Sequence, residues 1–378
     1  MTGFPELCAT TMDRDLASFF ARVTPDDVRR AMARSMPSAD DFLTLLSPAA
    51  QGLLEEMAQR AHELTVRHFG RTMQIFTPLY LSNHCTNRCV YCGFNAGTGV
   101  ARKRLTMDEV RAEGETIAAS GQRQLLILTG DAPALAGVDY LERCTKILRG
   151  MFPSVTMEVF AMTEAEYARL AAAGIDGLTM FQETYDPVLY ERLHPAGPKR
   201  DYAFRLGAPE RGCRAGMRVV NVGALLGLSP DWRREAFLTG LHADYLQRHY
   251  PNTDVAISLP RMRPHAGHFQ PATAVTDANL VQILLAQRIF LPFAGITIST
   301  REAPAFRDNI VPLGVTRMSA GVSTAVGGHA SDDNADTVQF EISDHRGLAE
   351  FSTMLRSRGY QPVYKDWEPN AHVAGNRP

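Results

Sequence analysis

The sequence lacks long hydrophobic runs and any excess of one charge. No window approaches about 18 uninterrupted apolar residues, so we expect no transmembrane helix. The first residues, MTGFPELCATTMDRDL, contain no basic segment followed by an apolar stretch, so we expect no signal peptide. The 39 Lys and Arg residues nearly balance 41 Asp and Glu residues, without a run of either sign. This balance argues against nucleic-acid and membrane partners.

Cysteine is scarce except in one stretch. Three of the six cysteines, Cys8, Cys144 and Cys213, are isolated from one another along the chain. This is not the pattern of a secreted disulfide framework, so we expect a reducing, cytoplasmic location. The other three cysteines lie within eight residues, in LSNHCTNRCVYCGF (81–94).

The order of apolar segments predicts an α/β fold. The first seventy residues carry helix signals only, such as Thr24-Pro25 at a helix start and Gly70 at a helix end. Short apolar or β-branched runs then alternate with helical segments, and eight such runs occur, at 75–82, 124–130, 155–162, 177–183, 218–228, 254–260, 295–301 and 315–321. Eight alternations favour a (β/α)8 TIM-type barrel. The short segment between the last two runs leaves an open or incomplete barrel as the alternative.

The chain shows no linker rich in Gly, Pro or Ser that would separate independent domains. We therefore predict an N-terminal helical extension over 1–72, a barrel over 73–330 and a C-terminal extension over 331–378. In such barrels the chemistry gathers where strands end. The predicted strand ends carry polar residues, namely Thr129-Gly130-Asp131, Gln182-Glu183, Arg261, Arg263, Arg301-Glu302 and Ser319. These residues predict one shared site.

The spacing of Cys85, Cys89 and Cys92 indicates the type of metal centre. Zinc sites usually combine two C-x-x-C pairs, and no second pair exists in this sequence. Three thiolates on one loop fit a 4Fe-4S cluster, in which a fourth iron stays open to another ligand. A zinc or iron scaffold without catalysis is the rival interpretation.

The motif CTNRCVYC resembles the cluster motif of the radical S-adenosylmethionine (SAM) enzymes, a superfamily of (β/α)8-type barrels. The resemblance implies that SAM chelates the open iron and that Tyr91 lies near its adenine. The chain is more narrowly similar to the 2-iminoacetate synthases, the tyrosine lyases of thiamine biosynthesis. This similarity extends from about Thr77 to Trp367 and is carried by LYLSNHCTNRCVYCGF, LLILTGD, MEVFAM, FQETYD, LPRMRP, STREAPAFRD and VYKDW.

The resemblance also implies roles for individual residues. Those expected to bind SAM, besides Tyr91, are Thr129, Gly130, Asp131, Gln182, Glu183 and Arg205. Arg301 is expected to hold the carboxylate of the substrate with help from Ser319, and Tyr80 to lie against its amine. A planar guanidinium suits a carboxylate because it can donate two parallel hydrogen bonds. The alternative for Arg301 is an ion pair with Glu302 or Asp308.

The reaction implied by the resemblance is radical cleavage of the Cα–Cβ bond of L-tyrosine. Its products are 2-iminoacetate (dehydroglycine) and p-cresol, together with methionine and 5′-deoxyadenosine from SAM. The implied partners are the thiazole synthase complex and a flavodoxin-type or ferredoxin-type reductant. The alternative is a lyase of the same subgroup that acts on another aromatic amino acid, such as tryptophan.

Overall fold

The protein is a parallel barrel in the computed structural model, which describes residues 3–265, 267–331 and 337–365. Its barrel strands are β1 (Thr72–Ser82), β2 (Gln124–Thr129), β3 (Ser154–Glu158), β4 (Gly177–Glu183), β5 (Val219–Ala224), β6 (Asp254–Ser258), β7 (Gly295–Ile298) and β8 (Arg317–Ser319). From β2 to β8 neighbours pair in chain order, and β1 closes the ring by pairing with β2 and β8. The predicted (β/α)8 barrel is confirmed, and the open alternative is wrong.

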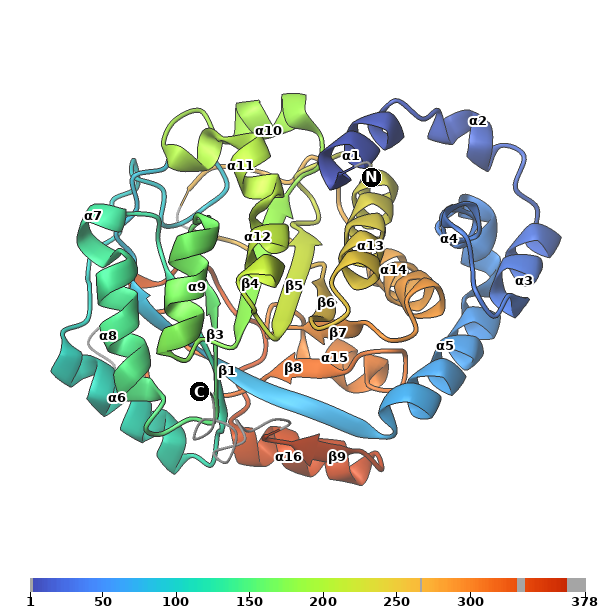
Figure 1. Ribbon diagram of the computed structural model, residues 1–378. Coiled ribbons are helices and arrows are strands. Elements are labelled where there is room, and N and C mark those ends of the chain that lie inside the picture. Colours follow the sequence, from blue (N-terminus) through green and yellow to red (C-terminus); the bar gives the residue numbers. More distant parts are fainter. Residues whose placement is uncertain (1–2, 266, 332–336, 366–378) are drawn as a thin grey trace, which may run out of the picture.

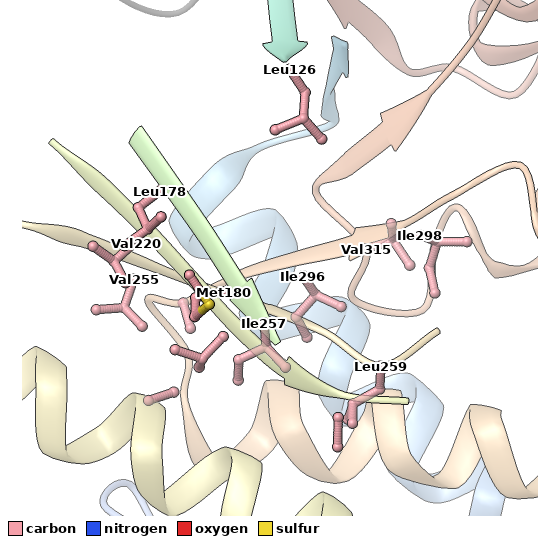
Figure 2. Close-up of a cluster of buried hydrophobic side chains, with 14 of the residues drawn as sticks. Leu126, Leu178, Met180, Val220, Val255, Ile257, Leu259, Ile296, Ile298 and Val315 are labelled. Carbon is pink, nitrogen blue, oxygen red and sulfur yellow. The ribbon is translucent and has the colours of Figure 1, made fainter. Parts of the chain in front are cut away.

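Successive residues of each strand face opposite sides of the barrel wall. On β3, Ser154, Thr156 and Glu158 face an interior cavity, whereas Val155 and Met157 are buried in the apolar core. Figure 2 shows the apolar side chains of β4 to β7 gathered in the same core, near the surrounding helices. The interior of the barrel is therefore partly polar, in contrast to the apolar centre of many such barrels.

Helices cover the outside of the barrel (Figure 1). They are α6 (Met107–Ala119), α7 (Pro133–Ala136), α8 (Val138–Leu148), α9 (Glu164–Ala173), α10 (Pro187–Leu193), η2 (Pro198–Arg200), α11 (Tyr202–Leu206), α12 (Ala208–Arg214), α13 (Trp232–His249), α14 (Asp277–Phe290) and α15 (Pro304–Ile310). The short connection between β7 and β8 contains only the seven-residue α15. No helix in the described part of the chain is long and apolar enough to span a membrane.

The N-terminal extension packs on one side of the barrel (Figure 1). It consists of α1 (Phe4–Met12), α2 (Leu16–Phe20), α3 (Pro25–Ala33), α4 (Ala39–Leu45), η1 (Pro48–Leu53) and α5 (Leu54–Phe69). As predicted, Thr24 caps α3 and Gly70 ends α5 with a φ of 65°. Phe42 stacks on Phe290 of α14 at 4.4 Å between ring centroids. The extension and the barrel therefore share one apolar core.

The C-terminal segment adds α16 (Leu348–Ser357) and β9 (Gln361–Val363). Strand β9 was not predicted, and it pairs in parallel with the start of β1. Between β8 and α16, the fully buried Asp344 forms an ion pair with the fully buried Arg307 of α15. Arg307 also donates to the carbonyl of Ser319, at the end of β8. This pair links the C-terminal segment to the barrel. Asp366 and Trp367, from the VYKDW match, lie outside the described residues.

The buried ion pair yields a prediction about stability. Asp344→Ala leaves the Arg307 guanidinium charged and buried without its carboxylate, and should lower the free energy of unfolding by about 3–5 kcal/mol. Urea-induced unfolding measures this change. Glu191→Ala is the matched control, because Glu191 and its partner Arg200 are 67% and 55% exposed. The control should change the free energy by less than about 1 kcal/mol. Equal effects of the two substitutions would contradict the prediction.

Candidate active site

A cavity runs along the inside of the barrel and includes the carboxyl ends of its strands, where the sequence predicts the site. The predicted site residues that line it are Tyr80, Cys85, Cys89, Tyr91, Cys92, Thr129, Gly130, Asp131, Glu183, Arg205, Arg301 and Ser319. The structure does not bring Gln182 to this cavity. Its side chain is buried elsewhere, and its amide has no hydrogen-bond partner among the described residues. Strand alternation explains this, because Glu183 and Gln182 are consecutive and face opposite ways.

Main-chain hydrogen bonds hold the cysteine loop, residues 83–95, which follows β1. The amide of Thr86 donates to the carbonyl of Asp131 at 2.8 Å, beyond the end of β2. The amide of Arg88 donates to the carbonyl of Ala196 at 3.0 Å, beyond α10. Since both loops belong to the barrel, the fold itself sets the position of the cysteines.

Two glycines allow other segments to approach the cysteine loop closely. A Cβ atom on Gly130 would lie 2.3 Å from the carbonyl oxygen of His84 and 3.1 Å from the Cβ of Cys85. A Cβ atom on Gly93 would lie 2.2 Å from the carbonyl oxygen of Gln339. Any side chain at either position would therefore push backbone away from the cysteines. This is the physical reason for glycine in Thr129-Gly130-Asp131.

The three cysteines fit an iron–sulfur cluster better than a single metal ion. They are free thiols that line one cavity. Within 3–265, 267–331 and 337–365, no three His, Cys, Asp or Glu side chains are grouped as ligands of one ion. In a cubane cluster each thiolate binds a different iron atom, so the sulfurs need not converge on one point. Burial raises the pKa of Cys89 to about 12, so iron must displace its proton on assembly.

A neutral histidine fixes Tyr91, the aromatic residue of the cluster motif. The Tyr91 hydroxyl lies 2.7 Å from Nε2 of His194, and Nδ1 of His194 lies 2.7 Å from the carbonyl of Tyr190. A carbonyl only accepts, so Nδ1 carries the proton and Nε2 accepts from Tyr91. Burial, helped by the charge of Lys199, lowers the pKa of His194 to about 3. The imidazole is therefore uncharged near neutral pH and orients the tyrosine ring.

Glu183 is held in a strained position between two cations. It is the one residue other than glycine with a positive φ, 72°, in the described part of the chain. Such backbone strain is common at functional sites. Its carboxylate lies 2.5 Å from Nζ of Lys199 and 3.6 Å from the guanidinium of Arg205. Burial alone would raise the pKa of Glu183, but these two cations lower it, so the carboxylate is ionised.

The end of β2 presents acceptors to the cavity. Oγ1 of Thr129 is buried without a hydrogen-bond partner among the described residues. The carboxylate of Asp131 accepts a hydrogen bond from Nδ2 of Asn87 at 2.8 Å, and Oδ1 of Asn87 accepts from the amide of Lys199 at 2.9 Å. An unsatisfied hydroxyl and a carboxylate in the wall of one cavity are suited to a ligand ammonium, which only donates. The arrangement fits the amino group of SAM.

Arg301 faces the cavity without a carboxylate partner among the described residues. The partner of Glu302 is Arg261, and that of Asp308 is Arg346 at 2.8 Å. Neither of the ion pairs considered as alternatives for Arg301 is therefore formed. The guanidinium carbon of Arg301 lies 3.5 Å from the ring centroid of Phe340.

Tyr80 and Ser319 have partners that position them. The hydroxyl of Tyr80 donates to Oε1 of Gln339 at 2.7 Å, and Nε2 of Gln339 lies 3.8 Å from Sγ of Cys92. Oγ of Ser319 accepts from the amide of Thr300 at 3.2 Å, directly before Arg301. Ser319 thus supports the backbone that carries Arg301.

Comparison with known proteins identifies the family. Residues 79–239 match the Radical SAM superfamily, and residues 258–361 match the Biotin and Thiamin Synthesis associated domain. The 2-iminoacetate synthase of Escherichia coli (strain K12) is 41% identical over 354 residues, which cover 94% of each chain. The chain belongs to the 2-iminoacetate synthase family. The enzyme of Salmonella typhimurium with the same name is 40% identical, over 91% of each chain.

Solved structures agree with this assignment. The FeFe-hydrogenase maturase HydG from Carboxydothermus hydrogenoformans superposes with a TM-score of 0.88 at 28% identity, covering 97% of this chain and 86% of that one. Members of the radical SAM superfamily use a 4Fe-4S cluster and SAM, so these are the cofactors of this 2-iminoacetate synthase family member, which is a lyase. The three thiols and the acceptors on β2 fit both groups. The expected superfamily and enzyme class are confirmed.

Sequence reasoning missed four residues of the site, namely Asn87, Glu158, Lys199 and Gln339. Asn87 and Lys199 connect the cysteine loop to Asp131 and Glu183. The alternation of inward-facing and outward-facing side chains along β3 is a signal that could have placed Glu158 inside the barrel. No local signal distinguishes Lys199 or Gln339, because only the folded chain brings them beside the cysteines.

The close contact at Gly130 yields a prediction about cluster assembly. Gly130→Ala adds a Cβ against the cysteine loop, and such overpacking typically costs about 1–3 kcal/mol. The purified variant should take up less iron and sulfide per chain on anaerobic reconstitution than the unchanged protein. Gly52→Ala is the control, because a Cβ there meets nothing within 4 Å. A full cluster in Gly130→Ala would contradict the proposed packing.

Proposed function

We propose that this enzyme cleaves the Cα–Cβ bond of L-tyrosine. The products are 2-iminoacetate and p-cresol, and SAM is consumed to methionine and 5′-deoxyadenosine. The name of the relatives, 2-iminoacetate synthase, supports the first product. The domain shared with biotin and thiamin synthesis supports a role in making the thiazole part of thiamine.

The main support for the proposal is Arg301, whose guanidinium has no carboxylate partner among the described residues. It lines the same cavity as the three cysteines. The other described cavity-lining cations include Lys199 and Arg205, which share Glu183, and Arg263, which donates to Oγ of Ser343 at 2.5 Å. A buried charge without a partner is costly unless a ligand supplies the opposite charge. An amino-acid carboxylate fits Arg301 in charge and shape.

The cluster and SAM supply the hydrogen-atom abstraction that starts the reaction. The protein supplies binding, orientation and exclusion of water. In this proposal Arg301 holds the substrate carboxylate, and Tyr80, which lines the same cavity, contacts the substrate amine. Because a fixed carboxylate limits which N–H bond approaches the cofactor, this anchor decides where the substrate reacts.

The imine product hydrolyses in water, so its use must follow its formation closely. We propose delivery to the thiazole synthase complex, and reduction of the cluster by a flavodoxin-type or ferredoxin-type protein. These partners are compatible with a cytoplasmic location.

Product analysis tests the proposal. The reconstituted, reduced holoenzyme is incubated anaerobically with SAM and either L-tyrosine or L-tryptophan, and the products are identified by mass spectrometry. Tyrosine should give p-cresol and 5′-deoxyadenosine in equal amounts. An indole product from tryptophan without p-cresol from tyrosine would show the alternative substrate, and would contradict the proposal.

Substitution of Arg301 tests the carboxylate anchor. Arg301→Met should raise the KM for tyrosine about ten- to a hundredfold, the equivalent of a lost charged hydrogen bond, and leave SAM affinity unchanged. Arg301→Lys should recover part of the loss, because it restores the charge without the planar fork. Arg248→Met, at a side chain that is 67% exposed, is the control. An unchanged KM in Arg301→Met would exclude this role.

A further inference from the structure

One acidic side chain in the cavity takes no part in the interactions described so far. Glu158 is the last residue of β3, and it lines the cavity together with Tyr80 and Arg301. It follows Ser154 and Thr156 on the inward face of the strand. Its backbone is fixed by pairing with Leu128 of β2. Glu158 therefore points into the site from a rigid element.

The carboxylate of Glu158 is unpaired, whereas the other carboxylates of the cavity wall have partners. Asp131 accepts from Asn87, Glu183 pairs with Lys199, and Glu302 pairs with Arg261. The side chain of Glu158 has no hydrogen bond or ion pair within 3–265, 267–331 and 337–365. A carboxylate left unpaired in a cavity is suited to a ligand that donates to it.

The groups around Glu158 are known. Glu183 on β4 is the carboxylate that faces it, Tyr80 on β1 lies near it, and the nearby cations are Arg301, Arg205 and Lys199. The adjacent strand β2 presents only Gln124, Leu126, Leu128 and Thr129 to the cavity. Burial, reinforced by Glu183, raises the pKa of Glu158 to about 7 against the effect of the three cations. Glu158 can therefore exchange a proton near neutral pH.

The proposed substrate is a zwitterion, with a carboxylate and an ammonium on the same carbon atom. Among the described residues of the cavity wall, Glu158 is the carboxylate without a partner, and Arg301 is a cation without a carboxylate. Their charges are complementary to those of the substrate. We propose that Glu158 is a catalytic base, which binds the substrate ammonium and accepts one of its protons before the hydrogen atom is removed. This inference rests on the proposed function.

The proton transfer balances without another reactant. The substrate R–NH3⁺ and the Glu158 carboxylate become R–NH2 and the Glu158 carboxylic acid, and no electron moves. The step has a chemical purpose. Loss of a hydrogen atom from a neutral amine leaves a neutral nitrogen radical, which can form the C=N bond as the Cα–Cβ bond breaks. An ammonium has no nitrogen lone pair, and the same loss would leave a cationic radical.

Binding without turnover tests this proposal. Tyrosine and its analogue without the amine, 3-(4-hydroxyphenyl)propanoate, are titrated by calorimetry into holoenzyme that contains the cluster and SAM but no reductant. Glu158→Gln should weaken tyrosine binding about ten- to a hundredfold, as expected for a charged hydrogen bond. Binding of the analogue should stay within a factor of about two, and Glu158→Asp should recover part of the tyrosine affinity. Glu164→Gln, at an exposed carboxylate, is the control.

A measurement on the unchanged enzyme keeps the test decisive if the variant folds poorly. Below pH about 7 Glu158 becomes protonated and loses its charge, so tyrosine affinity should fall between pH 8 and pH 6 while that of the analogue does not. The role of Glu158 would be overturned if the affinities for tyrosine and the analogue changed with pH in parallel. It would also be overturned if Glu158→Gln weakened the binding of both ligands equally. Unchanged tyrosine binding in that variant would also overturn it. If the unchanged enzyme binds no tyrosine and forms no p-cresol, the proposed function itself is wrong.

Discussion

Charges inside the barrel cavity must be balanced with little water to screen them, and the arrangement of the site depends on this constraint. Glu183 lies between Lys199 and Arg205, and Glu302 pairs with Arg261. These internal pairs neutralise the groups that shape the site. Arg301 and Glu158 have no such partner among the described residues, so they are free to bind a ligand of opposite charges. The proposed amino-acid substrate rests on Arg301, and the proposed role of Glu158 rests in turn on that substrate.

The cysteine loop depends on a second constraint, which is close contact with its neighbours. Backbone hydrogen bonds from Thr86 and Arg88, and the absence of a side chain at Gly130, set its distance from β2 and the loop after α10. The same neighbours carry Asp131 and Lys199, which line the cavity. The positions of the three cysteines and of these charged groups are therefore set by the same contacts.

The sequence predicted the barrel because each strand is a short apolar run bounded by turn residues, and such runs are recognisable locally. It did not predict β9, because QPV becomes a strand only by pairing with β1. The cysteines were predictable from spacing, and most other site residues from strand ends and family resemblance. Gln182 was placed in the site although it faces away. Lys199 and Asn87 were missed because their roles arise from contacts between distant segments.

The proposed reaction depends on the orientation of the substrate between Arg301 and Glu158. An anaerobic crystal structure of the holoenzyme with SAM and L-tyrosine tests it most directly. We predict the tyrosine carboxylate on the guanidinium of Arg301 and the tyrosine nitrogen within hydrogen-bond distance of the Glu158 carboxylate. A tyrosine bound with its carboxylate away from Arg301, or with its nitrogen beyond hydrogen-bond distance of Glu158, would contradict this orientation.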